Sequence, residues 1–489
     1  MALKSLSGLD AGFLSLETPE TLMHVGSLCT FERPDDLRGS FLPRVRRHIA
    51  GRLHLAPIFT RRLALMPLDL GHPVWVDAGK VDLEFHIRGA RLPRPGSERQ
   101  LEALVAKLHA QPLDRERPLW QFTVIEGLAD GGVALYSKVH HAALDGQAGI
   151  ALAQAMLDLG PVPREVPPPH ESHRARAPSK RLMLGTLFSN SLAQYAKLVR
   201  SVPGAVRAVA GAAAKLTDRI VAERGLPDDL MAPRTRFNTQ IGAARVFATC
   251  TLPLRDFKAV AAASEATIND LLLATCSGAL RRYLLGHKEL PRRSLVAAVP
   301  LSLREAGQVA QGNQVTMLPC TLGTDQKTPQ ARLAAIQAGM GKLKETTASY
   351  RDLIPTDYPS LGSPWLMTGL AKLYAKTHLA DRVPLPSNLV ISNVPGPPVP
   401  LYLAGARMTS YFPVSIVVHG LALNITVHSY DGNLHLGLIA CRKAVPDLQA
   451  LVAALYESFD ELKAMTASKL SAATPRPGAR RAGTRRGKA

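Results

Sequence analysis

The sequence predicts an α/β protein. The chain has 489 residues, enough for two to four domains of ordinary size. It is 46% hydrophobic and 20% charged, which is typical of a globular chain with a large core. Strand-like and helix-like patterns alternate over residues 1–165 and again over 236–466, and this alternation indicates the α/β class.

Each predicted element depends on a hydrophobic period. Apolar residues at every second position predict a strand over 133–139, and apolar residues at helical spacing predict a helix that includes 150–157. The dipeptide Asp431-Gly432 between two alternating runs predicts a hairpin over 423–439. Strands are also expected at 295–299 and 389–391, and a last helix is expected near 447–465.

Composition divides the chain into four segments. We expect an N-terminal half at 1–165, a basic connector at 166–235, a C-terminal half at 236–466 and a disordered basic tail at 467–489. Apolar residues at helical spacing over 188–202 predict an amphipathic helix in the connector. Two interpretations fit this helix: it lies on a membrane surface, or it packs its apolar stripe on the core.

The formal net charge of +20 favours polyanionic partners such as anionic lipid or a phosphorylated cofactor. Nucleic acid is not expected, because only 5% of the residues are aromatic and no nucleic-acid-binding motif occurs. No run of 18 apolar residues and no signal-peptide core are present, and the five cysteines are widely spaced. The sequence thus predicts a cytoplasmic protein without a membrane span.

Two adjacent histidines, His140 and His141, follow the predicted strand directly, and Asp145-Gly146 comes shortly after. Successive strand residues face opposite sides, so only one histidine can readily enter a given cleft. Imidazole titrates near neutral pH and suits general-base catalysis, for example the removal of a proton from a substrate hydroxyl. Asp145 could hold the imidazole or could lock the loop through an arginine.

Other chemistries fit the sequence less well. A metal site would need a third ligand, and neither HExxH nor a comparable cluster occurs, so no metal is expected. The sequence contains no GxSxG elbow, Walker A loop or GxGxxG fingerprint. Direct attack on an activated acyl donor such as a thioester is the simplest mechanism that remains.

The segment HHAALDG at 140–146 resembles the HHxxxDG motif of the coenzyme A-dependent acyltransferase superfamily, which includes chloramphenicol acetyltransferase and the condensation domains of peptide synthetases. Further blocks resemble the bacterial wax ester synthase/diacylglycerol acyltransferases. These blocks are LSGLDAGFL at 6–14, MHVGSL at 23–28, PLDRERPLW at 112–120, ATINDLLLA at 266–274, VPLSLR at 299–304, Gly312-Asn313, and SNVPGP at 392–397.

The resemblance implies two chloramphenicol-acetyltransferase-like halves with mixed sheets and a tunnel between them. Acyl-CoA would be a co-substrate, with no permanently bound cofactor, and the acceptor would be diacylglycerol or a long-chain alcohol. Peripheral association with an anionic membrane or a lipid-droplet surface is expected. The roles implied for single residues are the general base for His141, support for His140, a mainly structural role for Asp145, and the tunnel lining for Gly146, Asn269 and Asp270.

Alternatives accompany this interpretation. A carrier-protein-dependent condensation enzyme would share HHxxxDG, and a non-enzymatic lipid-binding protein could keep the fold. PLDRERPLW fits a packed turn with Trp120 in the core as well as a functional block, and SNVPGP fits a structural loop. Asn269 fits a helix N-cap, since asparagine is favoured there.

Overall fold

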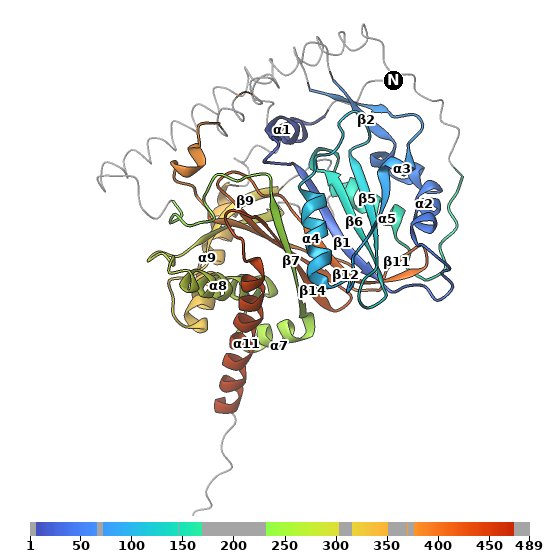
Figure 1. Cartoon of the computed structure of the whole chain (residues 1–489). Coiled ribbons are helices and arrows are strands. Elements are labelled where there is room, and N and C mark those ends of the chain that lie inside the picture. The colour runs from blue at the N-terminus through green and yellow to red at the C-terminus, as the bar shows by residue number, and fades with distance from the viewer. Residues whose placement is uncertain are drawn as a thin grey trace, which may run out of the picture.

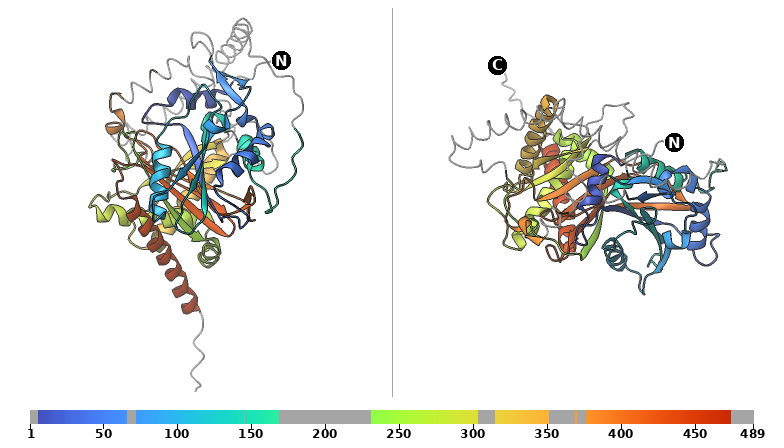
Figure 2. Two further views of the ribbon diagram at one scale, coloured as in Figure 1. Left: turned by 45° about the vertical axis from the view of Figure 1, so that its right-hand side comes forward. Right: turned by 90° about the horizontal axis from the view of Figure 1, so that it is seen from above.

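The computed structural model describes residues 6–65, 72–144, 146–168, 231–302, 315–350, 369 and 376–473. Within these ranges the chain forms two six-stranded sheets and one two-stranded ribbon. Figure 1 and the view from above in Figure 2 show the two large sheets side by side, each with its own helices. Because both sheets combine parallel and antiparallel pairs, the expected α/β class with mixed sheets is confirmed.

The first sheet has the strand order β11-β12-β1-β6-β5-β4. β4 runs parallel to β5, and the other pairs are antiparallel. Its two strands β11 and β12 come from residues 402–414, so a segment late in the chain completes the sheet begun by the N-terminal residues. The strands are β1 (His24–Phe31), β4 (Ile87–Arg91), β5 (Trp120–Glu126), β6 (Val133–His140), β11 (Tyr402–Leu403) and β12 (Ala406–Val414).

The second sheet has the order β7-β14-β13-β10-β8-β9, in which β10 runs parallel to both β13 and β8. Its strands are β7 (Arg245–Pro253), β8 (Val296–Ser302), β9 (Val315–Thr321), β10 (Leu389–Val394), β13 (Leu423–Tyr430) and β14 (Asn433–Cys441). The separate ribbon pairs β2 (Arg61–Ala64) with β3 (Val74–Asp77).

Helices cover the sheets. In Figure 1, α2, α3 and α5 lie at the first sheet, whereas α7, α8, α9 and α11 lie at the second. The helices are α1 (Gly8–Leu16), α2 (Leu42–Ala50), α3 (Leu83–His86), α4 (Glu98–His109), α5 (Gly146–Met156), α7 (Leu254–Ser264), α8 (Ile268–Gly286), α9 (Pro329–Tyr350) and α11 (Leu448–Ala473). Short 3₁₀ turns are η1 (Leu53–Leu55), η2 (Pro57–Phe59), η4 (His141–Ala143) and η7 (Leu379–Asp381).

The two faces of the first sheet contribute to different cores. Alternate residues of β6, such as Ala134 and Tyr136, join a large cluster that also contains Phe247 and Leu438 of the second sheet. The intervening residues, such as Leu135, pack on α2 in a second cluster. Since side chains alternate along a strand, β6 therefore directs one row of side chains toward the second half of the molecule.

The hydrophobic periods predicted these elements well. The strand over 133–139 is β6, the predicted helix is α5, which ends at Met156 rather than at 157, and the predicted hairpin is β13–β14. Its turn residues Asp431 and Gly432 have φ angles of 42° and 81°, as a type I′ turn requires. The last helix continues to Ala473, beyond the expected end near 465. The connector helix at 188–202 and the chain beyond Ala473 lie outside the described residues.

Candidate active site

The histidine pair lies where β6 ends and the η4 turn begins. The backbone nitrogen of His140 donates to the carbonyl oxygen of Leu119 at 3.0 Å, and that of His141 donates to the carbonyl oxygen of Met23 at 2.8 Å. The blocks MHVGSL and PLDRERPLW thus hold the backbone of the pair from both sides.

A glycine is required at position 26 of the first block, where β1 approaches β6 closely. A Cβ on Gly26 would lie 2.4 Å from the carbonyl oxygen of Ser137 on β6.

The two imidazole rings have different surroundings. The His140 side chain is fully buried, and its Nδ1 accepts a hydrogen bond from the backbone nitrogen of Ala142 at 3.1 Å. His141 is partly exposed, and its ring stacks on the ring of Phe13 in α1, with centroids 4.1 Å apart. The two adjacent residues at the strand end therefore differ in burial: His140 points inward, and His141 is the more accessible ring.

His141 is a neutral base in this environment. The pKa of its imidazole is lowered to about 4, chiefly by burial; hydrogen bonding to the residue's own backbone opposes this shift, and the neighbouring His140 adds to it. No other described residue hydrogen-bonds to the buried Nδ1. Nε2 is therefore the more accessible of the two ring nitrogens.

His140 faces a buried carboxylate. The Oε1 atom of Glu17 lies 3.5 Å from His140 Nε2 and accepts from the backbone nitrogen of Met23 at 3.1 Å. Arg115 donates to the other oxygen, Oε2, at 2.6 Å. Burial raises the pKa of the Glu17 carboxyl, but His140 and Arg115 outweigh it and hold that pKa near 2. We call Glu17, Met23, Arg115 and His140 the Glu17 cluster.

A second buried polar group lies on the same face of β6, two residues before His140. Lys138 is 1% exposed, and its Nζ donates to the carbonyl oxygens of Leu108 and Gln111 at 3.1 and 2.9 Å. Burial is the main cause that lowers the pKa of Lys138 to about 8. The lysine thereby ties the end of α4, and the residue just before the PLDRERPLW block, to the strand that bears the histidines.

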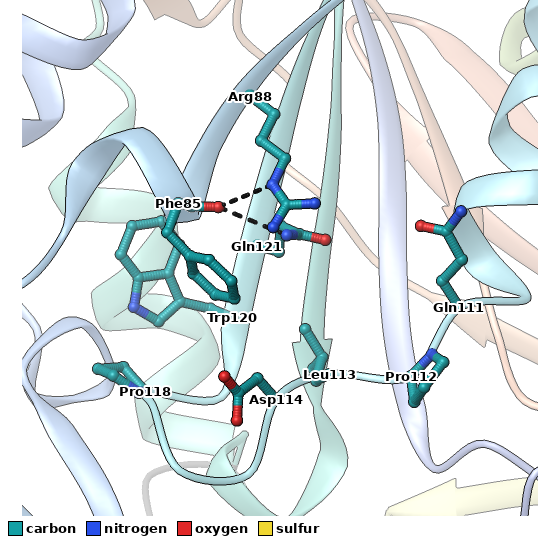
Figure 3. Close-up of a pocket in the computed structure, with 9 residues that line it drawn as sticks. All are labelled: Phe85, Arg88, Gln111, Pro112, Leu113, Asp114, Pro118, Trp120 and Gln121. Atoms are coloured by element: carbon teal, nitrogen blue, oxygen red, sulfur yellow. Dashed lines mark hydrogen bonds between the residues drawn. The ribbon is translucent and has the colours of Figure 1, made fainter.

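The PLDRERPLW block lines a small cavity of about 110 Å³, shown in Figure 3. Arg88 and Gln121 point into it from β4 and β5, and neither histidine of the pair lines it. The Trp120 side chain is 1% exposed and donates to the carbonyl oxygen of Phe59 at 3.2 Å, so the packed-turn interpretation holds for this residue. Arg115 and Leu119 are the members of the block that contact the histidine site.

Asn269 and Asp270 lie in the first turn of α8, and the N-cap of this helix is Thr267. The alternative that Asn269 is the N-cap is therefore wrong. Asp270 accepts from the backbone nitrogen of Thr267 at 3.0 Å, and Thr267 accepts from the backbone nitrogen of Asp270, which completes a capping box. Among the described residues, no hydrogen bond or ion pair joins Asn269 or Asp270 to the histidine pair.

The remaining predicted features of the site lie at the start of α5 and in later blocks of the chain. Gly146 is the first residue of α5, and Asp145 lies outside the described residues, as do Arg304, Gly312 and Asn313. In the SNVPGP block, the Gly396 backbone nitrogen donates to Ser429 Oγ at 2.9 Å, which anchors the turn after β10 to β13. No cluster of three metal-ligating side chains occurs in the described part of the chain.

Sequence reasoning missed the residues that support the pair. Phe13 and Glu17 belong to the α1 region, about 120 residues before His141, and Arg115 occupies a variable position of the PLDxxRPLW pattern. The contacts among these residues depend on how α1 packs on η4, which no short-range pattern specifies.

Comparisons with known proteins identify the family of the chain. The family model "Wax ester synthase/diacylglycerol acyltransferase catalytic domain" matches residues 6–272, and the model "WS/DGAT C-terminal domain" matches residues 311–463. A probable diacylglycerol O-acyltransferase of Mycobacterium tuberculosis is 36% identical over 462 residues, which cover 93% of this chain and 97% of that protein.

Solved structures are similar as well. The wax ester synthase/diacylglycerol acyltransferase from Marinobacter aquaeolei has a TM-score of 0.67 and 32% identity, and the match covers 95% of this chain and 100% of that one. The first condensation domain of the calcium-dependent antibiotic synthetase has a TM-score of 0.51 and 15% identity, so it shares the fold. The sequence blocks, the two mixed sheets and these matches agree: the chain belongs to the wax ester synthase/diacylglycerol acyltransferase family.

Proposed function

We propose that the chain transfers a long-chain acyl group from acyl-CoA to the hydroxyl of diacylglycerol, of a long-chain alcohol, or of both, with His141 as the general base. The observation that carries the proposal is the position of His141. Its imidazole lies at a fixed strand end, is partly accessible and has a pKa of about 4, so it is neutral at cellular pH. Membership of the family supports the reaction class.

In the proposed reaction His141 Nε2 takes the proton of the acceptor hydroxyl while that oxygen attacks the thioester carbon. The tetrahedral intermediate collapses when the carbon–sulfur bond breaks. The coenzyme A thiolate leaves and receives from the imidazolium the proton that came from the acceptor hydroxyl. Both substrates are held together in one complex, which lowers the entropic barrier, and no covalent acyl-enzyme is formed.

The proposal also includes the tunnel, the two halves of the chain and the surface to which the enzyme binds. Gly146, Asn269 and Asp270 line a tunnel between two halves, and Asp145 stabilises the loop after the histidines. The halves correspond to 1–165 and 236–466, joined by the basic connector, and the tail follows. No described helix is long and apolar enough to cross a membrane. The basic connector and tail hold the enzyme at an anionic membrane or lipid-droplet surface.

An assay with two acceptors tests the reaction. We expect purified protein to convert palmitoyl-CoA and either hexadecanol or diacylglycerol into the ester, with release of one free thiol for each ester formed. Product is measured by mass spectrometry, and thiol is measured in parallel. Activity with an acyl group on a carrier protein, but none with acyl-CoA, would favour the condensation enzyme. Lipid binding without turnover would favour the non-enzymatic protein.

The pKa of His141 predicts an unusual acid limit. A general base must be neutral, and the folded-state pKa of about 4 lies below the ordinary value of 6.5. As the pH is lowered, we expect kcat/KM to remain at its plateau past pH 6 and to fall to half of its maximum only near pH 4. Samples exposed to each pH and returned to pH 7 before assay control for unfolding. A reversible half-maximum near 6.5 would contradict the neutral, buried base.

A further inference from the structure

The ring of Phe13 covers one face of the His141 imidazole. The centroids are 4.1 Å apart and the planes are inclined by 24°, which is a stacked contact. Such a contact restricts the ring plane of the imidazole and excludes water from one of its faces. Phe13 itself packs against a small apolar cluster that includes Leu14, Leu119 and Ala142, so its ring has little freedom to move away.

Helix α1, which carries Phe13, is fixed at both ends. Ser7 is the N-cap residue, and its hydroxyl accepts from the backbone nitrogen of Asp10 at 3.1 Å. At the other end Arg115 donates to the carbonyl oxygen of Leu14 at 2.9 Å and also binds Glu17. The helix, which packs against η4, therefore holds Phe13 at a defined place. In Figure 1, α1 lies above the strands of the first sheet.

The same hydrogen bonds fix the backbone of His141. Glu17 accepts from the backbone nitrogen of Met23, and the carbonyl oxygen of Met23 accepts from the backbone nitrogen of His141. The Glu17 cluster thus holds both partners of the stacked contact: Arg115 binds α1, which carries Phe13, and Met23 binds the backbone of His141. Any shift of α1 relative to η4 has to break these bonds.

A general base needs a fixed ring orientation, and a carboxylate hydrogen-bonded to the second nitrogen commonly provides it. Among the described residues, no carboxylate hydrogen-bonds to His141, and Glu17 is directed at His140 instead. Besides the hydrogen bond to its own backbone, the stacking of Phe13 is the contact that the described residues provide to orient the ring. We propose that Phe13 is a positioning residue, which holds the His141 imidazole in the plane required for proton transfer. This inference rests on the proposed role of His141 as the base.

Four ionisable groups in the described part of the chain lie near this contact. His140 precedes His141 on β6, Glu17 follows α1 and faces His140, and Arg115 approaches from the PLDRERPLW block. Asp10, at the start of α1, is engaged with Ser7. A substitution at Phe13 leaves all of these groups in place. A change in the pKa of His141 would therefore result from the loss of the stacked Phe13 ring.

The test compares Phe13→Met with Phe13→Tyr. Methionine fills a similar volume without an aromatic face, and tyrosine keeps the ring. We expect Phe13→Met to lower kcat roughly tenfold or more, with a smaller change in KM, since misplacing a reacting group costs rate rather than binding. We also expect the acid limb of its kcat/KM profile to move from near pH 4 toward pH 6.5, while Phe13→Tyr stays close to wild type.

A readout independent of turnover separates this inference from the proposed function. Diethyl pyrocarbonate modifies neutral, accessible imidazole, and the modified peptide is quantified by mass spectrometry. His141 should be modified severalfold faster in Phe13→Met than in wild type or Phe13→Tyr, even if no acyl-transfer assay succeeds. Equal modification rates in folded Phe13→Met and wild type, or unchanged kcat and acid limb, would overturn the positioning role.

Discussion

Replacing His141 by alanine should lower kcat by about 10²–10⁴-fold, because general-base catalysis supplies that much of the rate and no other described side chain can substitute for the imidazole. Substrate binding should change far less, since the ring acts on the proton in the transition state. The reaction is followed with palmitoyl-CoA and whichever acceptor the wild-type protein prefers. The thermal unfolding midpoint, measured alongside, shows that the variant is folded.

A buried histidine elsewhere provides the matched control. His435 on β14 is 2% exposed, and burial lowers its pKa to about 4, as it does for His141. The folded fraction of His435→Ala should have most of the specific activity of the wild-type protein. Near-full activity of purified His141→Ala would refute the proposed mechanism. If His140→Ala lost transfer activity while His141→Ala kept it, the base would be His140.

The largest effect on stability is expected at Asp158. Arg52 donates to both carboxylate oxygens of Asp158, at 2.9 and 3.2 Å, and both residues are 3% exposed. Asp158→Ala leaves a buried guanidinium without its counterion, which costs about 3–5 kcal/mol. We expect a markedly lower midpoint of thermal or urea unfolding, although neither residue contacts the histidine pair.

An exposed pair of the same chemistry is the control for this prediction. Arg44 and Asp36 also lie 2.9 Å apart, but 71% of the Asp36 side chain is exposed. Asp36→Ala should shift the unfolding midpoint little, because water and salt screen the pair. The double substitution Arg52→Met with Asp158→Leu should recover much of the loss, since no unpaired charge stays buried. Equal shifts for Asp158→Ala and Asp36→Ala would contradict the role assigned to burial.

Local patterns predicted much of the fold. Alternation over 133–139 placed β6, and the dipeptide Asp431-Gly432 identified the hairpin, because strand periodicity and turn chemistry are properties of neighbouring residues. The motif at 140–146 identified the histidine pair. The blocks around it identified the family, which the comparisons confirm.

Other features depend on contacts between distant segments. Residues 402–414 complete the first sheet beside β1, and a pairing across nearly 400 residues has no signal in short-range periodicity. The same limit applied to α8, where asparagine and threonine are both good caps and the structure selects Thr267. Asp270, expected at the tunnel, has its described hydrogen bonds within the capping box of its own helix.

The sequence by itself determined the chemistry of this protein: which residues carry a titratable ring, where the strand that bears them ends, and which family the blocks resemble. The tertiary structure decided which ring is buried against Glu17 and which one is stacked on Phe13. The physical reason is that the pKa and orientation of an imidazole depend on burial and on nearby charges. These neighbours come from α1, β1 and the PLDRERPLW block, and only folding brings them together.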